Sequence, residues 1–375
     1  MKYDPNTIHT LVLKIGTSLL SGQQAFEGQV MESVVKELCA LKKRHDINVL
    51  IVSSGAVGCG MKTLGMTQRP ETLPEKQAVA AVGQATLMHY YETLFMTYGE
   101  GLHSAQVLLT FRDLDQRDSY LNARNTIHNL FKMKSVIPIV NENDSTAVDQ
   151  LRFGDNDTLS AKIAAKLSAG LLIILSDIDG LYAGNPQSGA DVAHIPLVNE
   201  ITAEIEDYAG GAGTSTGTGG MRTKVDAARI AMAAGVPTVI ADGHARDIVH
   251  KVLEGTARCT LFEPGEDVLS HRKRWIAFGR NIAGALQIDA GACDAILTHG
   301  KSLLSAGVTA SSGIYNEGDA VEIRDPEGVP IARALVNYSS NQVSLILGRK
   351  SHEIAGILGR KAHDEVVHRD NLVLL

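Results

Sequence analysis

The sequence predicts an α/β protein in which a mainly parallel sheet lies between helices, followed by a small C-terminal β module. Short apolar runs alternate with amphipathic stretches over the first 260 residues, and the pattern changes after about residue 265. Alternation of this kind is typical of a parallel sheet covered by helices. The chain has 375 residues, more than the roughly 250–300 residues of a usual single core, which favours two domains.

Five continuous apolar runs are predicted as strands buried on both faces, and a Gly, Ser, Asn or Asp marks the end of each. They span residues 10–16, 48–55, 136–143, 170–177 and 235–242. Helices are predicted over 29–44 and 78–98. Ligands bind beyond the carboxyl ends of such strands. The polar ends of four runs are therefore expected at one edge of the sheet: Lys14 to Thr17, Ser53 to Gly55, Asn141 to Asp144, and Ser176 with Asp177.

The composition argues against several classes of protein. The net charge of −7 disfavours a strongly basic nucleic-acid binder. The four cysteines include no CxxC zinc or redox motif, and their scarcity fits a reducing compartment. No apolar run approaches the roughly 20 residues of a membrane span, and the N-terminus lacks an apolar signal region. A cytoplasmic protein without a membrane partner is expected.

The C-terminal part has a different pattern. Residues 266–275 are polar and basic and are predicted to begin a linker over 266–280. Residues 281–368 contain short β-like runs separated by Gly and Asp-Pro turns, which predict a barrel or sandwich of roughly 85 residues. Residues 1–265 then form the α/β domain.

An acidic stretch, NENDSTAVDQLRFGDND, covers residues 141–157. Its carboxylates can hold lysines or reach Mg²⁺, directly or through water. Other interpretations stay open: Glu142 and Asp149 as solvated loop acids, and Asp155 as a helix N-cap.

A Gly-rich stretch, residues 209–220, runs into a helical pattern that contains Lys224. It is either a flexible surface loop or a cradle for phosphate at a helix N-terminus. Lys14 lies inside an apolar run and needs an anion, which is either a structural carboxylate or a phosphoryl group. Phosphoryl transfer needs positioned positive charge more than covalent chemistry. Lys14 and Lys224, held by a carboxylate between them, would supply that charge.

The motifs LKIGTSLL, IVSSGAVGCG, AAVGQ, PIVNENDS, FGDNDTLSA, LSDIDGLY and GTGGMRTK occur in the order seen in the amino acid kinase family. The chain resembles that family, and most closely its glutamate 5-kinase (γ-glutamyl kinase) branch. IDAGACDAIL, KSLLSAGV and GDAVEI in the tail resemble a PUA domain. The resemblance covers roughly residues 8–370.

The resemblance implies the amino acid kinase fold and ATP-dependent phosphorylation of the γ-carboxylate of L-glutamate, with Mg²⁺, as the first step of proline biosynthesis. It implies three catalytic residues, Lys14, Asp157 and Lys224. It also implies glutamate contacts from Ser54, Gly55, Asp144 and Asn156, and leaves the metal ligands unknown. The ATP contacts that it implies are Lys14, Ser176, Asp177, Thr218, Gly219, Gly220, Met221, Arg222, Thr223 and Lys224. An alternative interpretation of Arg222 is a solvated charge.

The alternatives are another amino acid kinase, acting on aspartate or N-acetylglutamate, or an RNA-binding role through the PUA domain. The resemblance further implies a homo-oligomer (dimer or tetramer) and proline as a feedback inhibitor. A downstream glutamyl phosphate reductase is the partner that it suggests.

Overall fold

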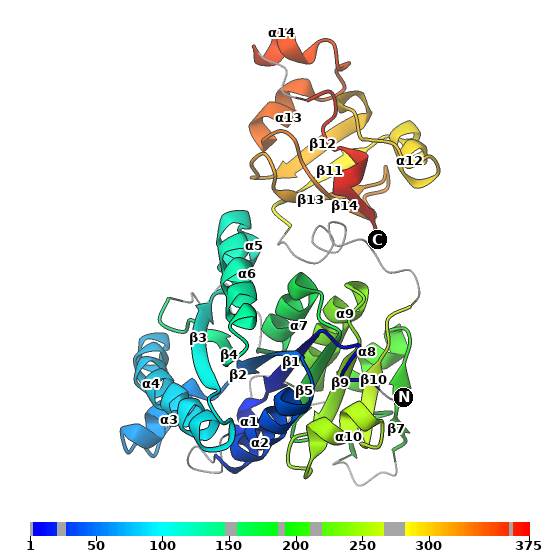
Figure 1. Cartoon of the computed structure of the whole chain (residues 1–375). Coiled ribbons are helices and arrows are strands. Elements are labelled where there is room, and N and C mark those ends of the chain that lie inside the picture. The colour runs from blue at the N-terminus through cyan, green and yellow to red at the C-terminus, as the bar shows by residue number, and fades with distance from the viewer. Residues whose placement is uncertain are drawn as a thin grey trace. The chain divides into compact units, whose positions relative to one another are not determined.

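A computed structural model describes residues 3–20, 28–146, 156–186, 192–210, 220–265, 282–359 and 363–375. The chain divides into two compact units, Met1–Val268 and Leu269–Leu375 (Figure 1). Several residues singled out from the sequence lie outside the described ranges, namely Asp149, Asp155, Thr218, Gly219 and the predicted linker 266–280.

The first unit is built on a sheet with the strand order β3-β4-β2-β1-β5-β9-β10-β8. All neighbours are parallel except the antiparallel pair β9–β10. The strands in sheet order are β3 (His103–Leu109), β4 (Val136–Glu142), β2 (Asn48–Ser53), β1 (Thr10–Ile15), β5 (Leu171–Ser176), β9 (Thr238–Asp242), β10 (Cys259–Phe262) and β8 (Leu197–Val198). A short hairpin, β6 (Leu181–Tyr182) with β7 (His194–Ile195), lies outside this sheet.

The five predicted apolar runs are β1, β2, β4, β5 and β9, which confirms the mainly parallel sheet. The sequence did not predict β3, β8 or β10. Strand β3 lies at the sheet edge with most residues partly exposed, so HSAQVLL carries no continuous apolar run.

Helices cover both faces of the sheet (Figure 1). One core joins the sheet to α2 (Gln29–Arg44), α4 (Leu73–Tyr98) and α10 (Ile248–Glu254). The other joins it to α5 (Phe111–Asp115), α6 (Arg117–Lys132), α7 (Asn156–Leu167) and α9 (Met221–Ala233). The structure also describes α1 (Thr17–Leu20), α3 (Ala56–Thr63) and α8 (Ala203–Ala209) in this unit. No helix of the described residues combines the length and apolar sequence that a membrane span requires.

Strand periodicity decides which face each polar residue reaches. In β1, Leu11 and Leu13 belong to the core under α2 and α4, while Val12 belongs to the core under α7 and α9. Successive side chains of a strand point to opposite faces. Lys14 therefore shares a face with Val12 and points toward α7 and α9.

Helices α3 and α4 pack in close contact near the start of α4. A Cβ atom on Gly60 would lie 1.9 Å from the carbonyl oxygen of Val79, and one on Gly83 would lie 1.8 Å from that of Ala56. Only glycine permits this approach. Helix α4 begins at Leu73 rather than at residue 78, and Thr72 with Glu75 forms a capping box there.

The second unit contains a five-stranded sheet with the order β12-β11-β13-β14-β15, in which only β11 and β13 are parallel. The strands are β11 (Gly284–Ile288), β12 (Val308–Gly313), β13 (Ala320–Arg324), β14 (Pro330–Leu335) and β15 (Leu372–Leu374). Three helices were not predicted: α12 (Ala290–Leu297), α13 (Ser340–Ile346) and α14 (Ile354–Leu358). The unit has its own apolar core.

Candidate active site

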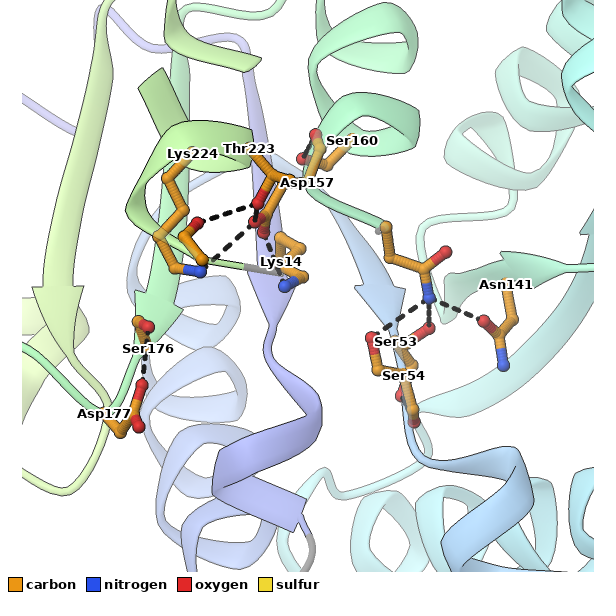
Figure 2. Close-up of polar contacts among 12 residues, drawn as sticks. Lys14, Ser53, Ser54, Asn141, Asp157, Ser160, Ser176, Asp177, Thr223 and Lys224 are labelled. Atoms are coloured by element: carbon orange, nitrogen blue, oxygen red, sulfur yellow. Dashed lines mark hydrogen bonds and ion pairs between the residues drawn. The ribbon is translucent and has the colours of Figure 1, made fainter. Parts of the chain in front are cut away.

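Three charged side chains from distant parts of the chain meet beside β1. The Asp157 carboxylate lies 2.5 Å from Lys14 Nζ through Oδ1 and 3.3 Å from Lys224 Nζ through Oδ2. Asp157 is fully buried, and Lys14 and Lys224 are 1% and 5% exposed. Figure 2 shows both lysines pointing at the carboxylate. We call these three residues the charge triad; together they carry one net positive charge.

Local structure explains how the triad is held. Asp157 lies in the first turn of α7, where a carboxylate interacts favourably with the helix dipole. Lys224 lies in the first turn of α9, where a cation is unfavourable unless an anion is near. Asp157 supplies that anion.

Thr223 connects the triad to the end of the Gly-rich stretch. Its hydroxyl lies 2.9 Å from Asp157 Oδ2 and 2.9 Å from the carbonyl oxygen of Gly220, which is the N-cap of α9. Both partners are acceptors, so they share one hydroxyl proton. Met221 begins α9 and packs against the core of that face. Thr223 therefore ties the position of α9 to the Asp157 carboxylate.

Arg222, Ser176 and Asp177, for which ATP contacts were predicted, each have polar partners of their own. Arg222 is half-exposed and forms ion pairs of 3.4 Å with Glu206 and with Asp226, its neighbour one turn along the helix. Ser176, at the buried end of β5, donates a hydrogen bond of 3.0 Å to Asp177. The carboxyl ends of β1 and β5, which are parallel neighbours, thus carry polar groups at the same edge of the sheet, as expected from the sequence.

A network of amides joins the ends of β2 and β4 to α7. Asn156 donates through Nδ2 to the carbonyl oxygen of Ser53 at 2.6 Å, to Asn141 Oδ1 at 2.8 Å and to Ser54 Oγ at 3.1 Å (Figure 2). Asn141 in turn donates through Nδ2 to Gln84 Oε1 on α4, at 3.1 Å. Because the amide hydrogens of Asn156 are used here, its Oδ1 is the atom that remains to accept a hydrogen bond.

A pocket of about 510 Å³ lies next to this network. Its lining comes from the start of α3, the residues around the start of α4, and the end of β4 with the loop that follows. The lining residues are Thr17, Ser54, Gly55, Ala56, Val57, Gly58, Arg69, Pro70, Lys76, Asn141, Glu142, Asp144 and Asn156. We call it the amide pocket.

The pocket brings together all four residues for which glutamate contacts were predicted: Ser54, Gly55, Asp144 and Asn156. Gly55 has φ of 95°, a conformation that favours glycine, and it turns the chain from β2 into α3. The backbone N–H groups at the start of α3 therefore border the pocket.

Sequence reasoning missed three residues here. Arg69 and Lys76 line the pocket, and Gln84 fixes the Asn141 amide. Lys76 lies in the first turn of α4, where a basic residue is unusual. That signal was not visible because the predicted helix began too late.

In the part of the chain that the structure describes, neither a thiolate nor a chelating cluster is found beside these groups. Cys59 in α3 is buried, and burial raises the pKa of its thiol to about 12, so it stays protonated. Within the described ranges, no group of three or more His, Cys, Asp or Glu side chains is placed to hold a metal ion.

Comparison with known proteins now identifies the family. Residues 9–242 match the amino acid kinase family model, and residues 284–358 match the PUA domain model. A glutamate 5-kinase of Moorella thermoacetica is 48% identical, with 97% of this chain and 96% of the relative covered. One of Nostoc punctiforme is 49% identical, with 98% and 99% covered.

A solved structure supports the fold alone. Carbamate kinase from Giardia lamblia, bound to AMP-PNP, superposes with a TM-score of 0.50 at 16% identity, covering 69% of this chain and 100% of that one. The sequence relatives decide the branch. The chain belongs to the amino acid kinase family and, within it, to the glutamate 5-kinases, and it carries a PUA domain.

Proposed function

We propose that this chain transfers the γ-phosphoryl group of ATP to the γ-carboxylate of L-glutamate, giving glutamyl 5-phosphate and ADP. This is the first step of proline biosynthesis. The observation that carries the proposal is the buried Asp157 carboxylate in contact with both Lys14 and Lys224. Membership of a kinase family gives ATP as the donor, and the relatives are named for glutamate.

The chemistry fits a site that supplies charge rather than a base. A carboxylate is already an ionised nucleophile, so one of its oxygens attacks the γ-phosphorus without losing a proton. The bond from phosphorus to the β,γ-bridging oxygen breaks, and its electron pair leaves with ADP. The site must bring the negatively charged carboxylate and phosphates together, and this requires positive charge to neutralise them. Two buried ammonium groups suit that task.

Each part of the site has a role in this reaction. Lys14 and Lys224 neutralise charge on the transferring oxygens, and Asp157 holds both ammonium groups in position. Ser54, Gly55, Asp144 and Asn156 bind glutamate in the amide pocket. We assign ATP binding to Ser176, Asp177 and the segment from Thr218 to Lys224, which includes Gly219, Gly220, Met221, Arg222 and Thr223.

We propose that Mg²⁺ binds together with the nucleotide. Mg²⁺ keeps several waters and is usually held by substrate phosphates with one or two carboxylates. The Asp177 carboxylate at the end of β5 is of the chemical type that such an ion accepts. The ion would supply further neutralisation of phosphate charge, and no step above depends on its geometry.

Further parts of the proposal follow the family. Proline carries the same α-carboxylate and a charged α-nitrogen, so a site that binds these groups of glutamate can admit it as a feedback inhibitor. We also propose a cytoplasmic homo-oligomer and transfer of the labile product to glutamyl phosphate reductase. The proposed boundaries are 1–265 for the kinase domain, 266–280 for the linker and 281–368 for the PUA domain.

The test is an assay with ATP, Mg²⁺ and L-glutamate in which hydroxylamine traps the acyl phosphate. Wild type should form glutamyl hydroxamate, and Lys224→Ala should lose about 10³-fold in kcat. Lys251→Ala, an exposed lysine on α10, is the control and should retain activity. Product from aspartate or N-acetylglutamate instead of glutamate would show that the substrate is wrong.

A further inference from the structure

The amide pocket contains charges of both signs, contributed by different elements. Glu142 and Asp144 come from the end of β4 and the loop after it. Arg69 comes from the segment before α4, and Lys76 comes from the first turn of α4. L-Glutamate has an α-ammonium and an α-carboxylate on one carbon atom, so it needs both kinds of partner in one pocket.

The amide network fixes the side of the pocket that accepts hydrogen bonds. Asn156 uses its Nδ2 group on Ser53, Ser54 and Asn141. Its Oδ1, together with the nearby carboxylates, can only accept. These groups suit a bound ammonium and not a bound carboxylate.

Lys76 is the cation whose placement the local structure does not explain. It lies half-buried in the first turn of α4, where the helix dipole disfavours a cation. Its neighbour Glu75 uses Oε2 on the backbone N–H groups of Glu71 and Thr72, at 3.2 and 3.1 Å. Within the described part of the chain, no salt bridge or hydrogen bond of the Lys76 ammonium is formed.

Arg69 is the competing cation in the same pocket. It is exposed to solvent and already interacts within the protein. Lys76 is the more buried of the two, and the Gly60–Gly83 contact holds its helix against α3. A charge on a fixed helix that is partly shielded from water gives the stronger and more selective ion pair.

We propose that the Lys76 ammonium binds the α-carboxylate of glutamate and so determines specificity for an α-amino acid with a free carboxylate. This rests on the proposed function. The ammonium of glutamate then faces Asp144 and Asn156. The γ-carboxylate extends from the pocket toward the charge triad, since Asn156 and Asp157 are adjacent in α7.

The test compares L-glutamate with its α-amide, L-isoglutamine, which keeps the α-ammonium and the γ-carboxylate but lacks the α-carboxylate charge. Wild type should prefer glutamate by about 10- to 100-fold in kcat/KM. Lys76→Met should lose most of that preference. Its kcat/KM for glutamate should fall by that factor, mainly through a higher KM, while its kcat/KM for isoglutamine should change less than about threefold. Lys76→Arg keeps the charge and should keep most of the preference, and KM for ATP should not change.

Two control variants sharpen the comparison. Lys62→Met removes an exposed lysine of α3 that does not line the pocket, and should behave as wild type. Arg69→Met tests the competing cation. Circular dichroism and a melting curve establish that each variant is folded.

Three outcomes with the two amino-acid substrates overturn the assignment. Lys76→Met does not differ in its effect on glutamate and isoglutamine, Arg69→Met alone reduces the preference for glutamate over isoglutamine, or wild type shows no such preference. Failure of the proposed function looks different, because wild type would then form no product from glutamate at all. A rise in KM for ATP in Lys76→Met would place the lysine at the nucleotide and would also refute the proposal.

Discussion

Replacing Asp157 by Asn tests the charge triad most directly. Asn has nearly the same volume and can still accept a hydrogen bond from Thr223, so charge is the main change. At 2.5 and 3.3 Å, and with an effective dielectric constant of about 20, each attraction to a lysine is worth roughly 5–7 kcal/mol before desolvation is considered. Breaking a buried pair by removing one partner costs a net 3–5 kcal/mol or so.

Thermal unfolding measures this cost. At about 2–4 °C per kcal/mol, the first unit of Asp157→Asn should melt roughly 6–20 °C below wild type. The double variant Lys14→Met/Asp157→Asn removes one of the two remaining ammonium groups. It should regain about 1–3 kcal/mol although it is inactive, because a buried charge is replaced by an apolar side chain.

Activity provides the second measurement. In the hydroxamate assay Asp157→Asn should lose about 10³-fold in kcat, since both lysines lose the group that positions them. A melting temperature within about 2 °C of wild type would refute the electrostatic reasoning. So would a double variant that melts below the single one, because packing rather than charge would then explain the loss.

Two further changes test other parts of the first unit. Gln84→Leu removes the acceptor for Asn141 and should raise KM for glutamate about tenfold, with kcat within threefold; Gln84→Glu keeps an acceptor, and an equal loss there would contradict this. Burial raises the pKa of Glu37 in α2. The folded state then holds the Glu37 proton to higher pH than the unfolded state, so this residue costs stability as pH rises from about 4 toward 7. The melting temperature of Glu37→Gln should therefore rise relative to that of wild type as the pH increases across that range. A difference in melting temperature that stays constant with pH would contradict this reasoning.

The central strands were predictable because burial on both faces leaves a continuous apolar run. Strand periodicity also fixes that Lys14 points away from Leu13 and toward the face of Val12. Its partner could not be derived in this way. Asp157 and Lys224 reach Lys14 only because α7 and α9 both cover that face, and periodicity does not state which helix covers which face.

The features that the sequence did not reveal are short, exposed or set by tertiary contacts. Strand β3 is an edge strand with partly exposed residues. Helices α12, α13 and α14 of the PUA unit have 8, 7 and 5 residues, too few for a clear period. Lys76 was missed for a different reason: α4 begins at the capping box of Thr72 and Glu75, a local signal, whereas the predicted helix began only at residue 78.

With glutamate bound as proposed, the amide pocket and the charge triad should reject the two rival substrates for different physical reasons. N-Acetylation replaces the α-ammonium by a neutral amide. Asp144 and Asn156 would then face a group with a single hydrogen-bond donor and no charge, so the substrate would bind more weakly. Aspartate keeps both α-groups and can bind them, but its side chain is one methylene shorter. Its carboxylate therefore stops about 1 Å short of the phosphoryl group, and an error of that size costs about 10²-fold in the chemical step. In the proposed binding mode, specificity for glutamate thus needs no contact with its side-chain methylenes. It would follow from the separation between the amide pocket, which is proposed to hold the α-carbon groups, and the charge triad, which is proposed to hold the phosphoryl group.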